Sequence, residues 1–278
     1  MSLLEAIVLG LVQGLTEFLP ISSTAHLRIV PALIKLVDSG HQWNDPGAAA
    51  SAIIQLGTMA AILVYFRRDI LRLTLALVTA LRHRRPFDTV DARLAWYVIV
   101  GTVPIVVLGV TLEEFIETRA RSLWIIAAAL IILALFLSLA ERLSSRRRGL
   151  DHLTWTDAVI IGLAQAAALI PGSSRSGTTI TAGLFLGLER ETAARFSFLL
   201  SIPAVAGSGL YELYRIRSAL GPHLGIPLLV ATGMALVSGY LAIAFLLRYL
   251  RTHTVYIFVW YRIGLGLLLL VLLTRGLV

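Results

Sequence analysis

The sequence has 278 residues, of which 58% are hydrophobic and only 14% are charged, and its formal net charge is +8. Soluble domains carry about 25% charged residues, so this composition excludes an ordinary soluble protein and indicates an integral membrane protein. The positive charge comes from arginines between apolar runs, which the positive-inside rule explains better than a nucleic-acid partner. The chain contains no cysteine, which excludes disulfides, thiolate metal sites and cysteine nucleophiles.

Six stretches are long and apolar enough to cross a bilayer, for which about 20 apolar residues are needed. They lie near 47–66, 92–112, 122–141, 193–213, 225–247 and 255–276. A further apolar stretch, 69–82, is short and carries Arg72. It predicts an interfacial or partly inserted helix rather than a full span.

Four shorter apolar segments form two pairs, and each pair is interrupted by proline and small hydroxyl residues. They are 3–19 with 25–37, and 154–169 with 178–188. Proline breaks a helix and leaves backbone polar groups without partners. Such breaks are tolerated at membrane depth only where protein buries them or where they line a wet cavity. We therefore expect two re-entrant helical hairpins, within 3–37 and 154–188.

The order of these elements predicts an inverted repeat within one all-α membrane domain. Each half, 1–148 and 149–278, contains one hairpin followed by three spans, and an odd number of spans turns the second half over. Both hairpins also read Gly-Leu-x-Gln, then an apolar run, then Pro-x-Ser-Ser. Inverted repeats with broken helices place a binding site where the repeats meet, near the midplane. We expect the two hairpin tips to meet there.

The distribution of arginine predicts the orientation. Arginines cluster within 67–85, 142–148, 190–195 and 248–251, whereas the segments 113–121 and 212–217 on the other side mix arginine with glutamate. The positive-inside rule assigns the first side to the cytoplasm. Both termini and the opening of the first hairpin are then expected outside.

The second tip, residues 171–179, has the composition of an anion-binding site. A new helix is expected to begin near Gly177, and the N-terminus of a helix binds anions through its free N–H groups. Arg175 adds a planar fork that can hold two phosphate oxygens. An arginine at membrane depth is costly and indicates function, although snorkelling or a structural pair with Glu17 would also account for it. Further donors in this tip are Ser173, Ser174, Ser176, Thr178 and Thr179.

The first tip supplies groups that the second lacks. Glu17 can act as a general base or bind a hard cation, and His26 can act as an acid, a base or a nucleophile. Ser22 and Ser23 are candidate nucleophiles if a base lies beside them. Gln13 lies one turn before Glu17 on the same helix face. Together the two tips carry the groups needed to hydrolyse a phosphate ester or anhydride.

Other groups within the spans give weaker signals. Gln55 and Ser201 lie at comparable places in the first span of each half, where they either complete the site or bond between helices. Aromatic residues near the span ends, including Tyr261, are typical of interface anchors rather than of a cofactor site.

Both tips closely resemble the signatures of the undecaprenyl-diphosphate phosphatase family, which is linked to bacitracin resistance. One signature is Glu or Gln, three residues, Glu, and then Pro-x-Ser-Ser-Thr-x-His; the other is Pro-Gly-x-Ser-Arg-Ser-x-x-Thr. The first matches Gln13, Glu17, Pro20, Ser22, Ser23, Thr24 and His26, and the second matches Pro171, Gly172, Ser174, Arg175, Ser176 and Thr179. Many members have glutamate where this chain has Gln13, so a metal-binding role would fall on Glu17.

The resemblance implies a bacterial cytoplasmic-membrane hydrolase whose site opens to the outer face. It would convert undecaprenyl diphosphate to undecaprenyl phosphate and inorganic phosphate, recycle this carrier lipid for peptidoglycan synthesis, and give bacitracin resistance. A divalent cation, Mg²⁺ or Ca²⁺, is implied by the same analogy. The expected partners are the polyprenyl diphosphate and membrane lipids but no nucleic acid, and a homodimer is open. An inverted-repeat transporter or flippase for a lipid phosphate or another anion is the alternative.

On this interpretation the catalytic candidates are Glu17, Ser23, His26 and Arg175, with Glu17 as a tentative metal ligand. Ser23 is the preferred nucleophile, and His26 or water are the alternatives. The candidates for binding substrate are Gln13, Ser22, Thr24, Gln55, Ser173, Ser174, Ser176, Thr178, Thr179 and Ser201.

Overall fold

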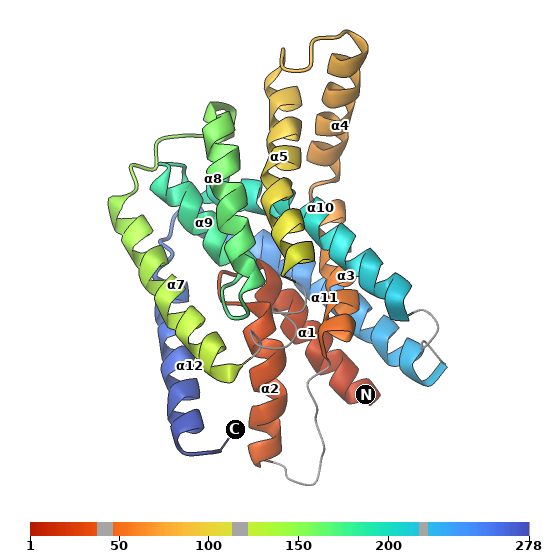
Figure 1. Ribbon diagram of the computed structural model, residues 1–278, viewed down its shortest axis with the longest axis vertical. Helices are drawn as coiled ribbons and strands as arrows, with labels where there is room; N and C mark the ends of the chain where they lie inside the picture. Colours follow the sequence, from red (N-terminus) through yellow and green to blue (C-terminus); the bar gives the residue numbers. More distant parts are fainter. Residues whose placement is uncertain (38–46, 113–121, 217–221, 278) are drawn as a thin grey trace.

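The computed structural model describes residues 1–37, 47–112, 122–216 and 222–277, and within these residues the chain is helical (Figure 1). The segment 113–121 and part of 212–217, which contributed to the predicted orientation, lie outside the described residues. The α-helices are α1 (Leu3–Phe18), α2 (Ser23–Val37), α3 (Gly47–Tyr65), α4 (Arg67–Arg82), α5 (Val90–Thr111), α7 (Leu123–Leu143), α8 (Trp155–Ala166), α9 (Arg175–Phe185), α10 (Arg190–Ile216), α11 (Pro222–Leu250) and α12 (Tyr256–Thr274). Two short 3-10 helices, η1 (Leu150–His152) and η2 (Ala167–Leu169), flank α8.

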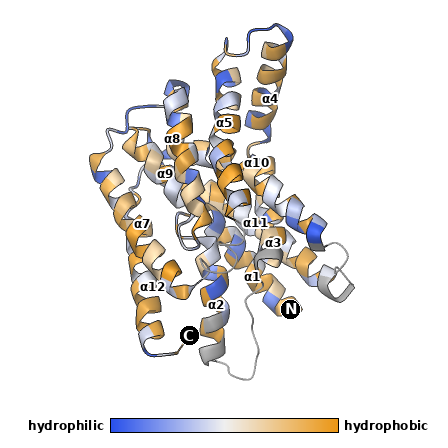
Figure 2. Cartoon of the chain, in the orientation of Figure 1, coloured by the Kyte–Doolittle hydropathy of each residue, from blue (hydrophilic) through white to orange (hydrophobic). Residues whose placement is uncertain are grey.

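In the described part of the chain, five helices are long and apolar enough to cross a membrane. They contain Val90–Thr111, Leu123–Leu143, Arg190–Arg215, Gly225–Leu250 and Tyr256–Thr274. A sixth span results if α3 and α4 count as one broken span, because the two helices meet at a bend of 76°. Hydrophobic residues dominate these helices (Figure 2). The prediction of an all-helical, multi-pass membrane protein is therefore confirmed.

Helix α4, in the stretch predicted to be interfacial, runs beside α5 and projects with it from the rest of the molecule (Figure 1). Its large side chains Leu71, Leu75 and Val78 are exposed, whereas Leu73 is buried. Helix α4 is therefore apolar on more than one face, which suits a helix in contact with lipid.

The two pairs of short helices approach each other end to end. In Figure 1, α1 and α2 lie in the lower half and α8 and α9 in the upper half, with the turns between them meeting in the middle. We call Leu19–Ser22 the first tip and Ile170–Ser174 the second tip. Both chain termini lie at the lower end of the same view, opposite the α4–α5 and α7–α8 connections.

Glycines let the short helices pack closely on the long ones. A Cβ on Gly10 of α1 would lie 2.3 Å from the carbonyl oxygen of Ala231 in α11. A Cβ on Gly162 of α8 would lie 2.5 Å from the carbonyl oxygen of Gly101 in α5. These are the glycines of the shared Gly-Leu-x-Gln motif. Each one therefore sets how deeply a short helix sits against its long neighbour.

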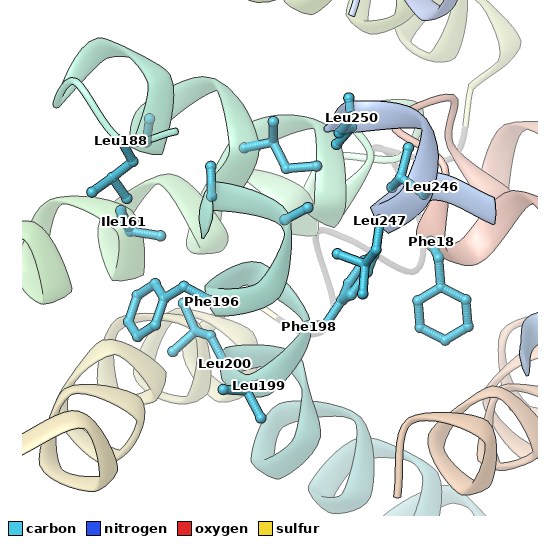
Figure 3. Packing of buried hydrophobic residues seen from close by; sticks show 14 of the residues in the cluster. Phe18, Ile161, Leu188, Phe196, Phe198, Leu199, Leu200, Leu246, Leu247 and Leu250 are labelled. Carbon is cyan, nitrogen blue, oxygen red and sulfur yellow. The ribbon is translucent and has the colours of Figure 1, made fainter. Parts of the chain in front are cut away.

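Beside the two tips, a hydrophobic cluster gathers side chains from α10 and the surrounding helices (Figure 3). Phe18, the last residue of α1, packs edge-on against Phe198 of α10, with the ring centroids 5.3 Å apart. Both side chains are 2% exposed or less. This contact holds the end of α1, and thereby the neighbouring Glu17, against the core.

Ion pairs tie together the end of the molecule that carries the arginine-rich connections. Glu141, which is 2% exposed, pairs with Arg146 and Arg190, and Arg148 pairs with Asp157 at the start of α8. Hydrogen bonding to Asp157 raises the pKa of Arg148. These pairs join α7 and the following connection to α8 and α10.

We predict that Gly10→Ala lowers the stability of the protein. The new methyl group would meet the backbone of α11 at 2.3 Å, and overpacking of this kind costs about 1–3 kcal/mol. Gly233→Ala is the matched control, since nothing lies within 4 Å of a Cβ there and alanine favours a helix over glycine by about 1 kcal/mol. Thermal unfolding followed by tryptophan fluorescence should give a lower midpoint for Gly10→Ala alone; equal midpoints would refute the packing argument.

Candidate active site

A serine in the left-handed backbone region ends each tip. Ser22 has φ 75° and Ser174 has φ 69°, a conformation that is uncommon outside glycine and is concentrated at functional sites. The hydroxyl of Ser22 accepts the N–H of Ala25 at 3.3 Å, and that of Ser174 accepts the N–H of Gly177 at 3.1 Å. Each serine therefore caps the helix that follows it, α2 or α9.

This geometry corrects the register expected from the shared Pro-x-Ser-Ser motif. That motif pairs Ser22 with Ser173, whereas the structure matches Ser22 with Ser174, because the second tip has one more residue between its proline and its helix. Helix α9 consequently begins at Arg175, two residues before the position predicted from sequence. Ser23 and Arg175 are the first residues of their helices and occupy equivalent places.

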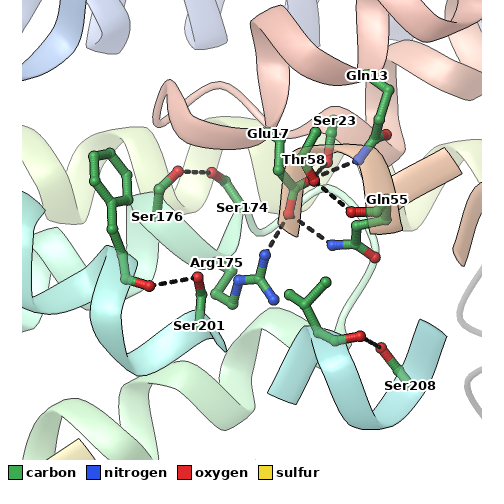
Figure 4. Close-up of polar contacts among 12 residues, drawn as sticks. Gln13, Glu17, Ser23, Gln55, Thr58, Ser174, Arg175, Ser176, Ser201 and Ser208 are labelled. Carbon is green, nitrogen blue, oxygen red and sulfur yellow. Dashed lines mark hydrogen bonds and ion pairs between the residues drawn. The ribbon is translucent and has the colours of Figure 1, made fainter. Parts of the chain in front are cut away.

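Glu17 lies at the centre of a hydrogen-bond network, and its side chain is 4% exposed (Figure 4). One carboxylate oxygen, Oε1, accepts from Gln55 Nε2 at 2.6 Å and from the guanidinium of Arg175. The other, Oε2, accepts from Gln13 Nε2 at 2.8 Å and from Ser23 Oγ at 2.6 Å. The four donors come from α1, α2, α3 and α9. A buried carboxylate has room for about four such bonds, so this one is fully satisfied in its ionised form.

His26 belongs to the first hairpin but does not join this network. Its Nδ1 lies 2.7 Å from the carbonyl oxygen of Ser22, and its Nε2 lies 2.6 Å from the hydroxyl of Tyr261. A carbonyl only accepts, so Nδ1 carries the hydrogen, and a neutral His26 accepts the Tyr261 hydroxyl at Nε2. Tyr261 was interpreted from sequence as an interface anchor. Its contact with the imidazole had no local sequence signal, because Tyr261 follows His26 by 235 residues along the chain.

The hydroxyls in the first turns of α9, just after the second tip, have different roles. Ser176 Oγ donates to the carbonyl of Leu19 at 3.1 Å and so joins α9 to the first tip. Thr178 and Thr179 instead donate to the carbonyl of Arg175, at 3.0 and 2.7 Å, within α9. These two threonines reinforce the first turn of α9 rather than reach Glu17.

Of the remaining candidates, some reach Glu17 and others bond within their own helix. Gln55 reaches Glu17, whereas Ser201, at the comparable place in the second half, donates to the carbonyl of Phe198 within α10 at 2.7 Å. Thr24 is exposed at the start of α2, and Ser173 is buried. The structure thus brings Gln13, Ser23, Gln55 and Arg175 to one carboxylate, and it leaves the hydroxyl of Ser201 outside this network.

A second arginine, Arg262 of α12, is fully buried and donates to backbone carbonyls of both tips. Sequence reasoning did not select it. An arginine inside an apolar span is itself a signal of function, and the position of Arg262 within the span 255–276 is such a signal.

The residues around Glu17 do not form a ready-made metal cage. Within the described ranges, no group of three histidine, cysteine, aspartate or glutamate side chains is placed to hold a metal ion. Glu17 already accepts four hydrogen bonds. A Mg²⁺ ion is commonly held by one or two carboxylates together with substrate phosphates. Glu17 fits that arrangement only if the substrate supplies most of the ligands.

The arrangement combines the elements of phosphoryl transfer. A serine hydroxyl hydrogen-bonds to a carboxylate, which is the geometry of a nucleophile beside its base. An arginine stands at the N-terminus of α9, where free N–H groups and the helix dipole favour an anion. The side chain of Arg175 is 15% exposed, more than the 4% of its partner Glu17.

Known proteins resemble this chain over nearly its whole length. The family described as "Bacitracin resistance protein BacA" matches residues 6–268. A protein of Myxococcus xanthus named undecaprenyl-diphosphatase is 57% identical over 99% of this chain and 91% of its own. Proteins of that name from Chloroherpeton thalassium and Chlorobaculum tepidum are 56% and 53% identical over 99% of this chain and 98% and 99% of theirs. The chain therefore belongs to the bacitracin resistance protein BacA family.

Proposed function

We propose that this protein hydrolyses undecaprenyl diphosphate to undecaprenyl phosphate and inorganic phosphate. The relatives named for this activity are more than half identical to the chain. The observation that carries the proposal is the convergence of the Ser23 hydroxyl and the Arg175 guanidinium on the Glu17 carboxylate. The reaction returns the carrier lipid to peptidoglycan synthesis and underlies bacitracin resistance. The names of the relatives favour this hydrolase over the transporter or flippase.

Ser23 is the nucleophile and Glu17 its base. The Ser23 hydroxyl already donates to Glu17 Oε2 at 2.6 Å, within the distance that general-base catalysis requires. Ser23 Oγ would attack the distal phosphorus and pass its proton to Glu17. The bond from that phosphorus to the bridging oxygen would break, and undecaprenyl phosphate would leave. Water would then hydrolyse the phosphoserine and release inorganic phosphate.

Arg175 and the start of α9 would hold the diphosphate. A guanidinium can bind two phosphate oxygens at once and stabilise the charge that develops on them. Arg175 occupies the place equivalent to Ser23, so the two side chains face the same carboxylate from opposite hairpins. The diphosphate would therefore lie between the two tips.

His26 is not placed to act as the base for Ser23. The carbonyl of Ser22 and the hydroxyl of Tyr261 occupy its two nitrogens, and Ser23 is bonded to Glu17 instead. Attack by His26 itself would first require the Tyr261 contact to break. This difference is why the geometry favours Ser23 as the nucleophile.

A divalent cation, Mg²⁺ or Ca²⁺, is part of the proposal. Glu17 would hold it together with oxygens of the diphosphate, since Glu17 is the one carboxylate of the network in the described chain. A hard cation of this kind supplies neutralisation of phosphate charge.

The proposed setting is the bacterial cytoplasmic membrane, with two inverted repeats, 1–148 and 149–278, and re-entrant hairpins. The packing supports the repeat if α1, α3 and α5 of the first half correspond to α8, α10 and α11 of the second. Helix α1 then packs on α11 as α8 packs on α5, and α3 packs on α11 as α10 packs on α5. Exchanging the two halves turns each of these pairs into the other. The pairs α7 with α12 and α3 with α10 map onto themselves. On the positive-inside rule, the site would open to the outer face and both termini would lie there.

We predict that Glu17→Gln and Arg175→Lys each lower kcat by a factor of about 100 or more. Glutamine keeps the shape but cannot accept the Ser23 proton, a role worth about 10²–10⁴ in rate, and lysine lacks the planar fork of arginine. Glu191→Gln and Arg251→Lys are matched controls, because they alter an ion pair on the exposed surface. The measurement is phosphate release from undecaprenyl diphosphate by purified protein in detergent. Wild-type rates in folded Glu17→Gln or Arg175→Lys would remove these residues from the site.

We predict a phosphoenzyme on Ser23. With substrate labelled in the distal phosphate, rapid quenching in acid should retain label on the protein, because phosphoserine survives acid whereas phosphohistidine does not. Ser23→Ala should lose both label and turnover, and Ser201→Ala, whose hydroxyl bonds within α10, should keep both. Label that is stable only in alkali would place the phosphate on His26. Turnover that persists in Ser23→Ala would indicate direct attack by water.

We predict that removing divalent cations slows turnover. Purified protein treated with a chelator should release phosphate at least about tenfold more slowly, since the diphosphate charge would no longer be neutralised. Adding Mg²⁺ or Ca²⁺ back should restore the rate. Undiminished phosphate release in metal-free buffer would show that Arg175 and the helix N-terminus suffice.

A further inference from the structure

Arg262 combines full burial with hydrogen bonds that all go to backbone carbonyl oxygens. It lies in α12 and has no exposed surface. Its three nitrogens donate to five carbonyl oxygens over 3.0–3.3 Å. The acceptors are Pro20, Ala129, Leu130, Gly172 and Ser173.

No carboxylate pairs with Arg262 within the described residues, in contrast to Arg175 with Glu17 and Arg148 with Asp157. A buried charge is costly unless polar groups surround it, and at membrane depth it marks function. The charge of Arg262 is instead distributed over carbonyl dipoles. An apolar residue in α12 would avoid that cost, so the arginine must contribute something beyond packing.

The carbonyls that Arg262 binds belong to the two tips and to α7. Pro20 is in the first tip, three residues before Ser23, while Gly172 and Ser173 are in the second tip, just before Arg175. Two other contacts join α9 to the first hairpin, namely the bond from the Ser176 hydroxyl to the carbonyl of Leu19 and the Arg175–Glu17 pair. Both of those contacts are made by side chains of α9. The guanidinium of Arg262, in contrast, comes from α12 and binds backbone carbonyls of both turns.

Gly177 makes room for this fork. A Cβ on Gly177 would lie 2.6 Å from Nη1 of Arg262, a distance that real Cβ atoms do not reach, so either the guanidinium or α9 would have to move. The same glycine donates its N–H to the cap Ser174. Gly177 therefore lies where the fork, the cap and the start of α9 meet.

We propose that Arg262 is a positioning residue that clamps the two tips in the relative register at which Ser23 and Arg175 meet Glu17. It acts through the backbone of the turns and not through contact with substrate. The inference rests on the proposed phosphatase function and deepens it. Because a displacement of about 1 Å at a distance from the chemistry can cost about 10²-fold in rate, the clamp should affect kcat far more than KM.

The first test compares Arg262→Met and Arg262→Lys with the control Arg275→Met, which removes an exposed arginine just after the same helix. Arg262→Met should lower kcat about 100-fold with KM within about threefold of wild type, the pattern of a lost transition-state interaction. Arg262→Lys should stay at least about tenfold below wild type, because a single ammonium cannot span five acceptors. A wild-type kcat in folded Arg262→Met, full recovery by lysine, or a rise in KM with kcat unchanged would each overturn the proposal. Folding is checked by gel filtration and thermal unfolding.

The second test uses Gly177→Ala, which keeps the arginine but displaces its fork. It should lower kcat without a matching rise in KM, and it should add little when combined with Arg262→Met, whose shorter side chain leaves space for the methyl group. This non-additivity is the signature of a shared contact. If Arg262→Met does not fold, Gly177→Ala decides, and a wild-type kcat there overturns the clamp. Wild-type protein that releases no phosphate would instead refute the proposed function.

Discussion

The structure of this protein is organised around a single buried carboxylate. Glu17 lies within a membrane protein, where an ionised side chain without partners would be prohibitively unstable. Four donors from four helices resolve that problem. Because α1, α2, α3 and α9 must all reach the same two oxygens, the requirements of one charge fix how the hairpins and the first long helix meet. The network that stabilises the carboxylate is the same set of groups that we propose for catalysis.

Strain in the turns accompanies this convergence. Ser22 and Ser174 adopt a backbone conformation that disfavours any residue except glycine, and a penalty of about 1–3 kcal/mol at each is tolerated where the surroundings fix it. In return, each serine caps the next helix through its own hydroxyl, which glycine could not do. The two turns are alike in this device although their sequences differ in length. Ser23 and Arg175 lie opposite each other because each is the first residue of its helix. Their distances from the preceding proline differ.

Much of the fold follows from apolar periodicity and length, because a bilayer demands long apolar helices. The sequence predicts that the groups of the two tips meet, because polar groups in apolar surroundings need partners, but it does not predict that Gln13 and Gln55 both donate to Glu17. Tyr261 and Arg262 were not anticipated as part of the site. They reach His26 and Pro20 across 235 and 242 residues, and helix packing, not local sequence, decides such contacts. The sequence also does not predict that Ser22 corresponds to Ser174 rather than to Ser173. Backbone conformation, and not residue type, defines which serine caps the helix.

The balance of charge at the site leaves part of the charge of a diphosphate unmatched. Arg175 is paired with Glu17, so the two side chains together carry no net charge. The guanidinium of Arg262 is bound to backbone carbonyls and holds the turns rather than the diphosphate. The N-terminus of α9 adds a partial positive charge. A diphosphate carries more negative charge than one arginine can balance, and the divalent cation that we propose would supply the remaining positive charge.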